Sequence, residues 1–195
     1  MLGVLSNRIY AKLFAAQIVA LLGTGLLTIA LGLVAFELAG DAAGVVLGLA
    51  LTLKMIAYVG FSPIANALFA RWDRKSVLIG ADLIRAAIAL MLPFVDEIWQ
   101  IYGLIFLLQA ASATFTPAFQ AIIPDILKDE SDYTRALSLS RLAYDIENIV
   151  SPALAGLLLS FMSFHWLFVG TAFGFSGSIL LIAIYPESRT TRIFC

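Results

Sequence analysis

Ionisable side chains fall inside long apolar stretches of the sequence, where an unpaired charge is costly, and the set centres on Lys54, Asp145 and Glu147. Counted inward from Gly44, Lys54 lies about 15 Å deep, near the middle of a bilayer if its stretch is a membrane helix. Glu147 is the acid whose depth best matches that of Lys54. An amine and a carboxylate at this depth can bind a polar ligand or exchange a proton. The alternative is a buried ion pair that only fixes helix packing.

Uncharged polar side chains recur at helical spacing in the same stretches, because residues at i, i+3/i+4 and i+7 share one face of a helix. Such a stripe either lines a wet path or joins two helices by hydrogen bonds. The amides of Gln17 and Gln109 favour the wet path, since each needs several partners. The candidate pathway residues are Gln17, Thr24, Lys54, Tyr58, Gln109, Ser112 and Thr116, and the candidate proton-coupling residues are Asp145 and Glu147.

The sequence lacks the residue sets that are typical of an enzyme or a metal centre. It has one cysteine, Cys195, and one histidine, His165, and it contains no Gly-rich phosphate loop and no nucleophile–base set. We therefore expect no catalytic residue, no metal and no cofactor. The formal net charge of −1 gives no basic field for nucleic acid, so nucleic acid is not an expected partner.

The elements that must position these residues are long, unbroken apolar runs. Of the 195 residues, 62% are hydrophobic and 13% are charged, whereas soluble domains carry about 25% charged residues. Each run is long enough to cross about 30 Å of hydrocarbon as a helix, and none alternates as barrel strands do. The predicted fold is an all-α membrane protein, one bundle over residues 1–195. The expected transmembrane helices span about 13–36, 44–70, 76–94, 99–121, 137–160 and 164–185.

Basic residues outside these runs fall only on alternate connections. By the positive-inside rule, both termini and the loops 71–75 and 122–136 are expected to be cytoplasmic. The protein would then be a multi-pass protein of the cell inner membrane, with the lipid bilayer as its surroundings. The residues that carry this expectation are Arg8, Lys12, Arg71, Arg74, Lys75, Lys128, Arg135, Arg189 and Arg192.

A Ser-Pro segment occurs in both the second and the fifth run, at 62–68 and 151–157. The two segments match in kind, and one run heads inward where the other heads outward. This is the relation expected of two three-helix units of inverted topology. Ser-Pro pairs also recur in other membrane helices, because neighbouring groups can satisfy the freed carbonyls.

The connection after the second run resembles a signature of the major facilitator superfamily, roughly Gly-x-Leu-Ala-Asp-Arg-x-x-Arg-Arg/Lys. Asn66 and Ala70 stand where the motif has Gly and Asp. The fifth run, with Ser151-Pro152 and Gly156, is similar to the Gly-Pro motif of the family's exporters. The matching residues of the first motif are Leu68, Arg71, Arg74 and Lys75.

The resemblance also implies a gate on the cytoplasmic side, where the charged motif latches two halves of the transporter together. We assign this gating motif to the charged residues of the connection and of the third run. For Asp82 and Arg85, the alternative is a local i, i+3 pair that holds the third helix to the basic loop. The gating set is Arg71, Asp73, Arg74, Lys75, Asp82 and Arg85.

The resemblance covers all six runs and is strongest to drug-efflux-like bacterial members. It implies that helices one and four line a central cavity, two and five flank it, and three and six lie outside. A full transporter of this kind has twelve helices in two halves, so the chain corresponds to the N-terminal half. The implied function is proton-coupled efflux of a small amphipathic compound. The implied partners are that substrate and a missing C-terminal half or a second copy. The alternative is a truncated product or fragment with no transport activity of its own.

Overall fold

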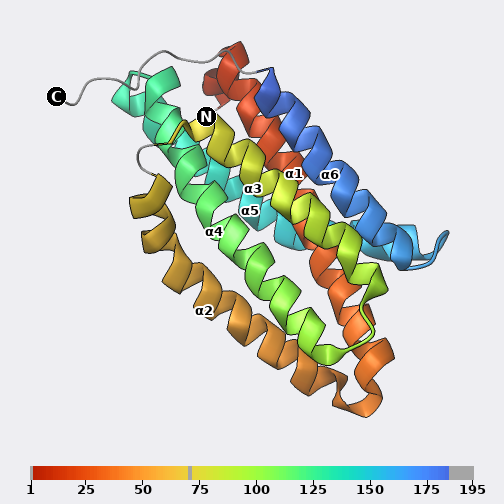
Figure 1. The fold of residues 1–195 in the computed structure, drawn as a ribbon. Helices are drawn as coiled ribbons and strands as arrows, with labels where there is room; N and C mark the ends of the chain where they lie inside the picture. Colours follow the sequence, from red (N-terminus) through yellow and green to blue (C-terminus); the bar gives the residue numbers. More distant parts are fainter. Residues whose placement is uncertain (1, 70–71, 185–195) are drawn as a thin grey trace.

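The computed structural model of the chain describes residues 2–69 and 72–184, which are helical apart from short connections (Figure 1). Three 3-10 turns accompany the helices: η1 (Leu2–Ser6), η2 (Gly40–Ala42) and η3 (Leu92–Phe94). The α-helices are α1 (Arg8–Ala39), α2 (Ala43–Phe69), α3 (Arg74–Met91), α4 (Ile98–Ile126), α5 (Glu130–Leu159) and α6 (His165–Ala183).

Five segments of the described chain are long and apolar enough to cross a membrane. The first, Arg8–Ile64, counts as a single segment of 57 residues because η2 joins α1 and α2 without a break in helical structure. The other four fall on α3, α4, α5 and α6. The chain is thus an all-α assembly of apolar helices, as a multi-pass membrane protein requires. Six separate crossings stay a prediction.

Side-chain caps set where several helices begin. The Asn7 side chain accepts a hydrogen bond from the backbone N–H of Ile9 at 3.0 Å, which starts α1. Asp129 caps α5 and accepts from the backbone N–H of Ser131 at 2.8 Å. Hydrogen bonds from the Ser131 side chain and backbone lower the pKa of the Asp129 carboxyl below its usual value. The cap is therefore charged at neutral pH and is lost only as the pH falls through that lowered pKa.

The capping by Asp129 changes the expected boundary of α5. Residues 122–136 were predicted as a loop, but α4 continues to Ile126 and α5 begins at Glu130. Acidic residues in the first turn of a helix are stabilised by its dipole. Glu130 and Asp132, which fall in the predicted loop, therefore lie in the first turn of α5.

The central helix of the bundle is α1, which packs against α6, α5, α2 and α4, while α3 packs between α4 and α6. The α1–α6 contact is close because glycines face each other: a Cβ on Gly174 would lie 3.3 Å from the Cα of Gly23. The Thr171 hydroxyl donates to the carbonyl of Gly23 at 3.0 Å. In contrast, α2 packs mainly on α4 and α5 mainly on α1, and we call these two the edge helices. In Figure 1, α2 lies along one side of the bundle and α5 lies behind α3 and α4.

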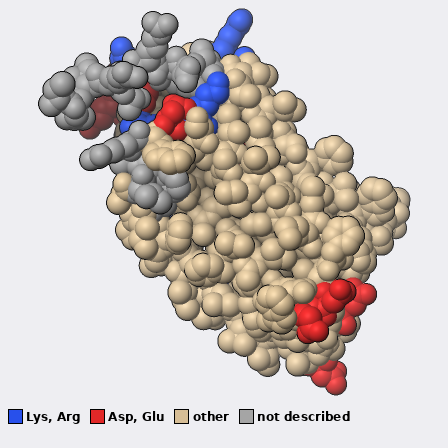
Figure 2. Space-filling model, viewed as in Figure 1, with Lys and Arg blue, Asp and Glu red and all other residues tan. Residues whose placement is uncertain are grey.

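The two ends of the bundle differ in charge. On the face in Figure 2, all Lys and Arg side chains lie at one end, and the other end shows only Asp and Glu, with an uncharged middle between them. The acidic end contains the turns that carry Asp41 and Asp96. This separation fits the alternation of basic connections seen in the sequence, whereas the side of the membrane on which each end lies stays a prediction.

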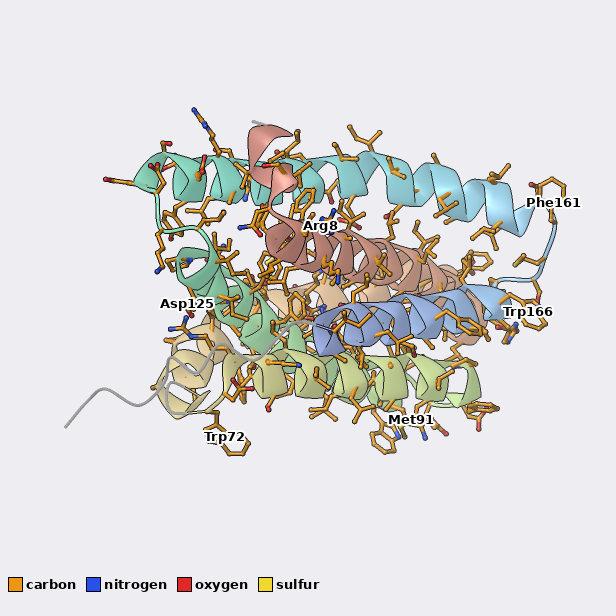
Figure 3. The ribbon with its side chains drawn as sticks, turned by 90° about the horizontal axis from the view of Figure 1, so that it is seen from above. Arg8, Trp72, Met91, Asp125, Phe161 and Trp166 are labelled. Carbon is orange, nitrogen blue, oxygen red and sulfur yellow. The ribbon has the colours of Figure 1, made fainter. Side chains whose placement is uncertain are left out.

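Exposed aromatic side chains lie at both ends. Figure 3 shows Trp72 with Asp125 at one end, and Phe161 with Trp166 at the other. The exposed fractions are 58% for Trp72, 81% for Phe161 and 59% for Trp166. Aromatic residues of this kind are enriched where a membrane meets water. The apolar middle of the bundle therefore lies between two ends that carry exposed aromatic side chains.

Candidate functional site

A cavity of about 320 Å3 lies between α1, α2, α4 and α5. Because α2 packs on α4 and α5 packs on α1, the two edge helices leave this space between them. Apolar side chains such as Leu21 and Met55 alternate with polar ones along its wall. All the predicted pathway residues line it, namely Gln17, Thr24, Lys54, Tyr58, Gln109, Ser112 and Thr116.

Lys54 and Glu147 reach the cavity from the two edge helices, α2 and α5. They interact electrostatically, but no ion pair or hydrogen bond joins them within residues 2–69 and 72–184. Glu147 Oε1 instead accepts a hydrogen bond from the Ser151 hydroxyl at 3.2 Å. Both side chains thus line the cavity without the direct ion pair that would only fix helix packing.

Asp145 does not join Glu147. Its Oδ1 lies 3.7 Å from Nε of Arg141, and the side chains are 60% and 81% exposed, respectively. Asp145 is also absent from the residues that line the cavity. Of the two carboxylates predicted to couple protons, the structure brings only Glu147 into contact with the predicted pathway.

The polar side chains of the cavity wall make two kinds of hydrogen bond. Gln17 Nε2 donates to the Ser140 hydroxyl at 2.6 Å, which ties α1 to α5. Thr24 and Ser112 instead donate to carbonyls of their own helices, at 3.0 and 2.9 Å. Both alternatives raised by the sequence therefore occur: Gln17 joins two helices, while Thr24 and Ser112 form no bond to another helix in the described chain.

Two further residues of α5 line the cavity and were not among the predicted pathway residues: Tyr144 and Asn148. The Tyr144 hydroxyl lies 3.3 Å from Oγ1 of Thr116 on α4. Both residues share the polar face of α5 with Glu147, at i−3 and i+1. The signal that could have identified Tyr144 is this helical spacing, applied outward from the chosen acid.

Asp82 and Arg85 form the local i, i+3 ion pair that was the alternative to a gating role, but the pair lies inside the bundle and not at the basic loop. Both are buried, with exposed fractions of 0% and 4%, and they form an ion pair inside the bundle. The Arg85 guanidinium lies 4.3 Å from the ring centre of Phe115 and 4.8 Å from that of Phe175. Arg85 also lines the cavity, although α3 was expected to lie away from it.

The position of Arg85 follows from its depth. At 1.5 Å per residue, Arg85 lies about 16 Å from the start of α3 at Arg74, well inside the apolar part of the bundle. A long side chain there extends between the aromatic rings of α4 and α6 to reach the cavity. The estimate of depth that was applied to Lys54 in the sequence could also have identified Arg85 as a residue of the bundle interior.

The other residues of the predicted gating motif bind within the bundle. Arg74 forms an ion pair with Asp125 at 2.7 Å and donates to the carbonyl of Ala121, both on α4. Lys75 donates to the carbonyl of Ala183 on α6 at 2.9 Å. Asp73 caps α3 by accepting from the N–H of Ser76 at 2.9 Å. These contacts hold the basic ends of α3, α4 and α6 together, and Arg71 lies outside the described residues.

No cluster of three or more His, Cys, Asp or Glu residues in the described ranges could hold a metal ion. What the cavity offers is a set of hydrogen-bonding groups, one amine, one guanidinium and one carboxylate on a largely apolar wall. Such a wall can bind an amphipathic molecule and can change its charge with the protonation of Glu147.

Comparison with known proteins places these features in a family. Residues 13–193 match the family model of the Major Facilitator Superfamily. Macrolide efflux protein A of Streptococcus pyogenes is 34% identical over 156 residues, which cover 77% of this chain and 38% of that protein. An uncharacterized MFS-type transporter of Bacillus subtilis is 29% identical over 176 residues, covering 90% of this chain and 42% of the relative. Multidrug resistance protein MdtG of Salmonella typhimurium is 27% identical over 188 residues, covering 95% and 45%.

No solved structure matches the chain with comparable significance. The chain spans less than half the length of these relatives, from 38% to 45%. The match to the family model nonetheless extends from α1 through α6. The chain therefore belongs to the major facilitator superfamily.

Proposed function

We propose that the bundle contributes half of an exporter that moves a small amphipathic compound out of the cell in exchange for protons. The observation that carries this proposal is the cavity in which Lys54 and Glu147 line opposite edges of a largely apolar wall. The apolar wall suits the hydrophobic part of such a compound, and the polar groups suit the rest. The names of two relatives, a macrolide efflux protein and a multidrug resistance protein, support export as the direction.

The arrangement of helices supports two inverted three-helix repeats as the finer architecture. Pro63 in α2 and Pro152 in α5 occupy the two helices that flank the cavity on opposite sides. The open side between α2 and α5 is where a second six-helix half, or a second copy of this chain, would close the pathway. Rocking of one half against the other would then expose the cavity to each side in turn.

Glu147 can couple this movement to protons because protonation changes the charge of the cavity by one. When the cavity faces outward, uptake of a proton neutralises Glu147 and leaves Lys54 without its electrostatic partner. This change alters the affinity for the polar part of the substrate and favours its release. Loss of the proton to the cytoplasm restores the binding form.

Replacing Glu147 with Gln is expected to abolish efflux that depends on a pH gradient, since the amide keeps the size and the bond to Ser151 but cannot ionise. The measurement is transport of a fluorescent amphipathic dye in proteoliposomes with an imposed pH gradient. It is made for the chain alone and for the chain extended by the coding sequence downstream of codon 195. Dye efflux in the variant should fall to that of protein-free liposomes.

The matched control is Asp145→Asn, which makes the same chemical change two residues away, on an exposed side chain outside the cavity. This variant should keep gradient-driven efflux. If Glu147→Gln still responds to the gradient as the unmodified chain does, then Glu147 does not couple protons. If neither the chain nor its extended form moves the dye, the chain is not a half of this kind of exporter.

The orientation of the bundle gives a second test. With Cys195 replaced by Ser, the sequence has no other cysteine, so single cysteines can be introduced by Asp96→Cys at the acidic end and Lys128→Cys at the basic end. We expect a membrane-impermeant maleimide to label Asp96→Cys in right-side-out membrane vesicles. Lys128→Cys should react only after the vesicles are permeabilised. The reverse pattern would place the termini outside the cytoplasm.

A further inference from the structure

The hydroxyl of Ser151 donates to a carboxylate, whereas other hydroxyls in these helices donate to their own backbone. Thr52, Ser112 and Ser138 each donate to the carbonyl four residues earlier, at 2.9 Å. The carbonyl of Glu147 is available to Ser151 in the same way, but the Ser151 hydroxyl donates to Oε1 of that residue, at 3.2 Å. The hydroxyl therefore acts on the acid that lines the cavity and not on the backbone of α5.

This hydrogen bond is enclosed where α5 meets α1. The exposed fraction of Ser151 is 1%. A Cβ on Gly25 of α1 would overlap both Oγ of Ser151 and Oε1 of Glu147, so the backbone of α1 lies directly against both atoms. Water has little room to replace a donor in such a place. Loss of the Ser151 hydroxyl would leave this side of the carboxylate without a partner.

Serine at position 151 is a departure from the exporters' Gly-Pro motif, in which glycine precedes the proline. A glycine would have neither the hydroxyl nor the Cβ of Ser151. The facing helix has its own glycine, Gly25, which leaves the room that the Ser151 side chain fills. This chain therefore places a hydrogen-bond donor beside Glu147 at a position where the motif has none.

A hydroxyl donor distinguishes the two protonation states of a carboxyl group. It bonds more strongly to the carboxylate than to the neutral acid, because the bond to the ion is charge-assisted. Lys54 of α2 attracts the same ionised form from another part of the cavity lining. In the described chain, α1 and α4 contribute only uncharged side chains to this lining. The other titratable groups in it are Tyr58 of α2, Arg85 of α3 and Tyr144 of α5.

We propose that Ser151 is a positioning residue for proton coupling, whose hydroxyl holds the Glu147 carboxylate at the contact of α1 with α5 and favours its ionised form. Uptake of a proton by Glu147 weakens this hydrogen bond. Protonation thus changes the contact between two helices as well as the charge of the cavity. The inference rests on the proposed function in one respect, that Glu147 is the group that takes up and releases the proton.

The test follows the protonation of Glu147 directly, by infrared difference spectroscopy of the full chain in liposomes over a range of pH. The C=O stretch of a protonated carboxyl group gives a band, and its loss in Glu147→Gln assigns the band to Glu147. In Ser151→Ala the midpoint of this titration should move up by about one pH unit, as loss of a hydrogen bond to a charged group implies. The band should also move to higher frequency, because the C=O group has lost its donor.

Two further variants separate the hydrogen bond from other effects of the alanine. Ser138→Ala removes a hydroxyl of the same helix that donates to a backbone carbonyl, so it should leave the midpoint and the band unchanged. Ser151→Cys keeps a side chain of similar shape that donates more weakly. Its midpoint should lie between those of Ser151→Ala and the unmodified chain, and it gives the same test if the alanine variant does not fold.

An unchanged midpoint in the Ser151 variants would overturn the inference, and so would a midpoint that moves down. An equal shift in Ser138→Ala would also overturn it, because the effect would not depend on this contact. If Glu147→Gln loses no band, Glu147 takes up no proton and both proposals fail. The titration does not need transport, so a shifted midpoint in a chain that moves no dye, alone or extended, would refute the proposed function and leave the action of Ser151 on Glu147 standing.

Discussion

Asp82→Ala is expected to lower the free energy of unfolding by about 3–5 kcal/mol, because it leaves the guanidinium of Arg85 buried without its counter-charge. Asp82 is 0% exposed and Arg85 is 4% exposed, so water cannot replace the lost carboxylate. The rings of Phe115 and Phe175 still face the guanidinium, but both contacts are already present in the unmodified chain, so they do not offset the loss. The measurement is the midpoint of thermal unfolding in detergent, followed by circular dichroism.

Asp145→Ala is the matched control, since it makes the same substitution in an exposed pair with Arg141. Exposed pairs contribute at most about 1 kcal/mol, so this variant should unfold close to the unmodified chain. The double variant Asp82→Asn/Arg85→Gln should recover most of the stability lost in Asp82→Ala, because it removes the unpaired charge. Equal midpoints for Asp82→Ala and Asp145→Ala would mean that Arg85 does not depend on Asp82.

Helical periodicity and depth predicted seven pathway residues, and all seven line the cavity. They come from the helices α1, α2 and α4, and four of them illustrate the polar side of an otherwise apolar helix: Gln17, Lys54, Gln109 and Thr116. A polar side chain inside an apolar helix is expected to face the interior of the bundle, because its contact with lipid is costly. The sequence therefore predicts the faces of α1, α2 and α4 without any knowledge of their contacts.

Periodicity also had limits, which Asp145 and Arg85 make clear. Asp145 and Glu147 are two residues apart, so they point about 160° away from each other around α5 and cannot both face one cavity. Because both are carboxylates in the same run, they share one predicted role, proton coupling. Their spacing, however, places them on different faces of α5. Arg85 shows the opposite limit, because a long side chain can reach past its own helix. Its contact with Phe115 and Phe175 depends on how α3 packs between α4 and α6, which no single stretch of sequence contains.

The second large effect is expected at Gly25, where α1 lies directly against Glu147 and Ser151 of α5. A Cβ built on Gly25 overlaps Oγ and Cβ of Ser151 and Oε1 of Glu147. Glu147 can rotate its carboxylate away, but Cβ of Ser151 is fixed to the backbone, so α5 itself must shift. Overpacking of this kind costs about 1–3 kcal/mol. Gly25→Ala should therefore lower the unfolding midpoint in detergent, and it should weaken gradient-driven dye efflux because it displaces Glu147.

Gly32→Ala gives the matched control on the same helix. Its Cβ would meet only Leu47 Cδ2 at 3.9 Å, which is an ordinary contact. The helix-propensity gain of about 1 kcal/mol on replacing Gly with Ala applies to both variants, so the difference between them isolates the contact with α5. We expect Gly32→Ala to be as stable as the unmodified chain or more stable.

A compensating change separates crowding from other effects of the alanine. Ser151→Gly removes Cβ and Oγ from the opposite helix, so the double variant Gly25→Ala/Ser151→Gly moves the small residue from α1 to α5 and keeps the helices at the same distance. Its unfolding midpoint should return most of the way to that of the unmodified chain. Efflux should return less completely, because Glu147 no longer accepts the hydrogen bond from the Ser151 hydroxyl. If the double variant is no more stable than Gly25→Ala, close packing of α1 against α5 is not what the glycine provides.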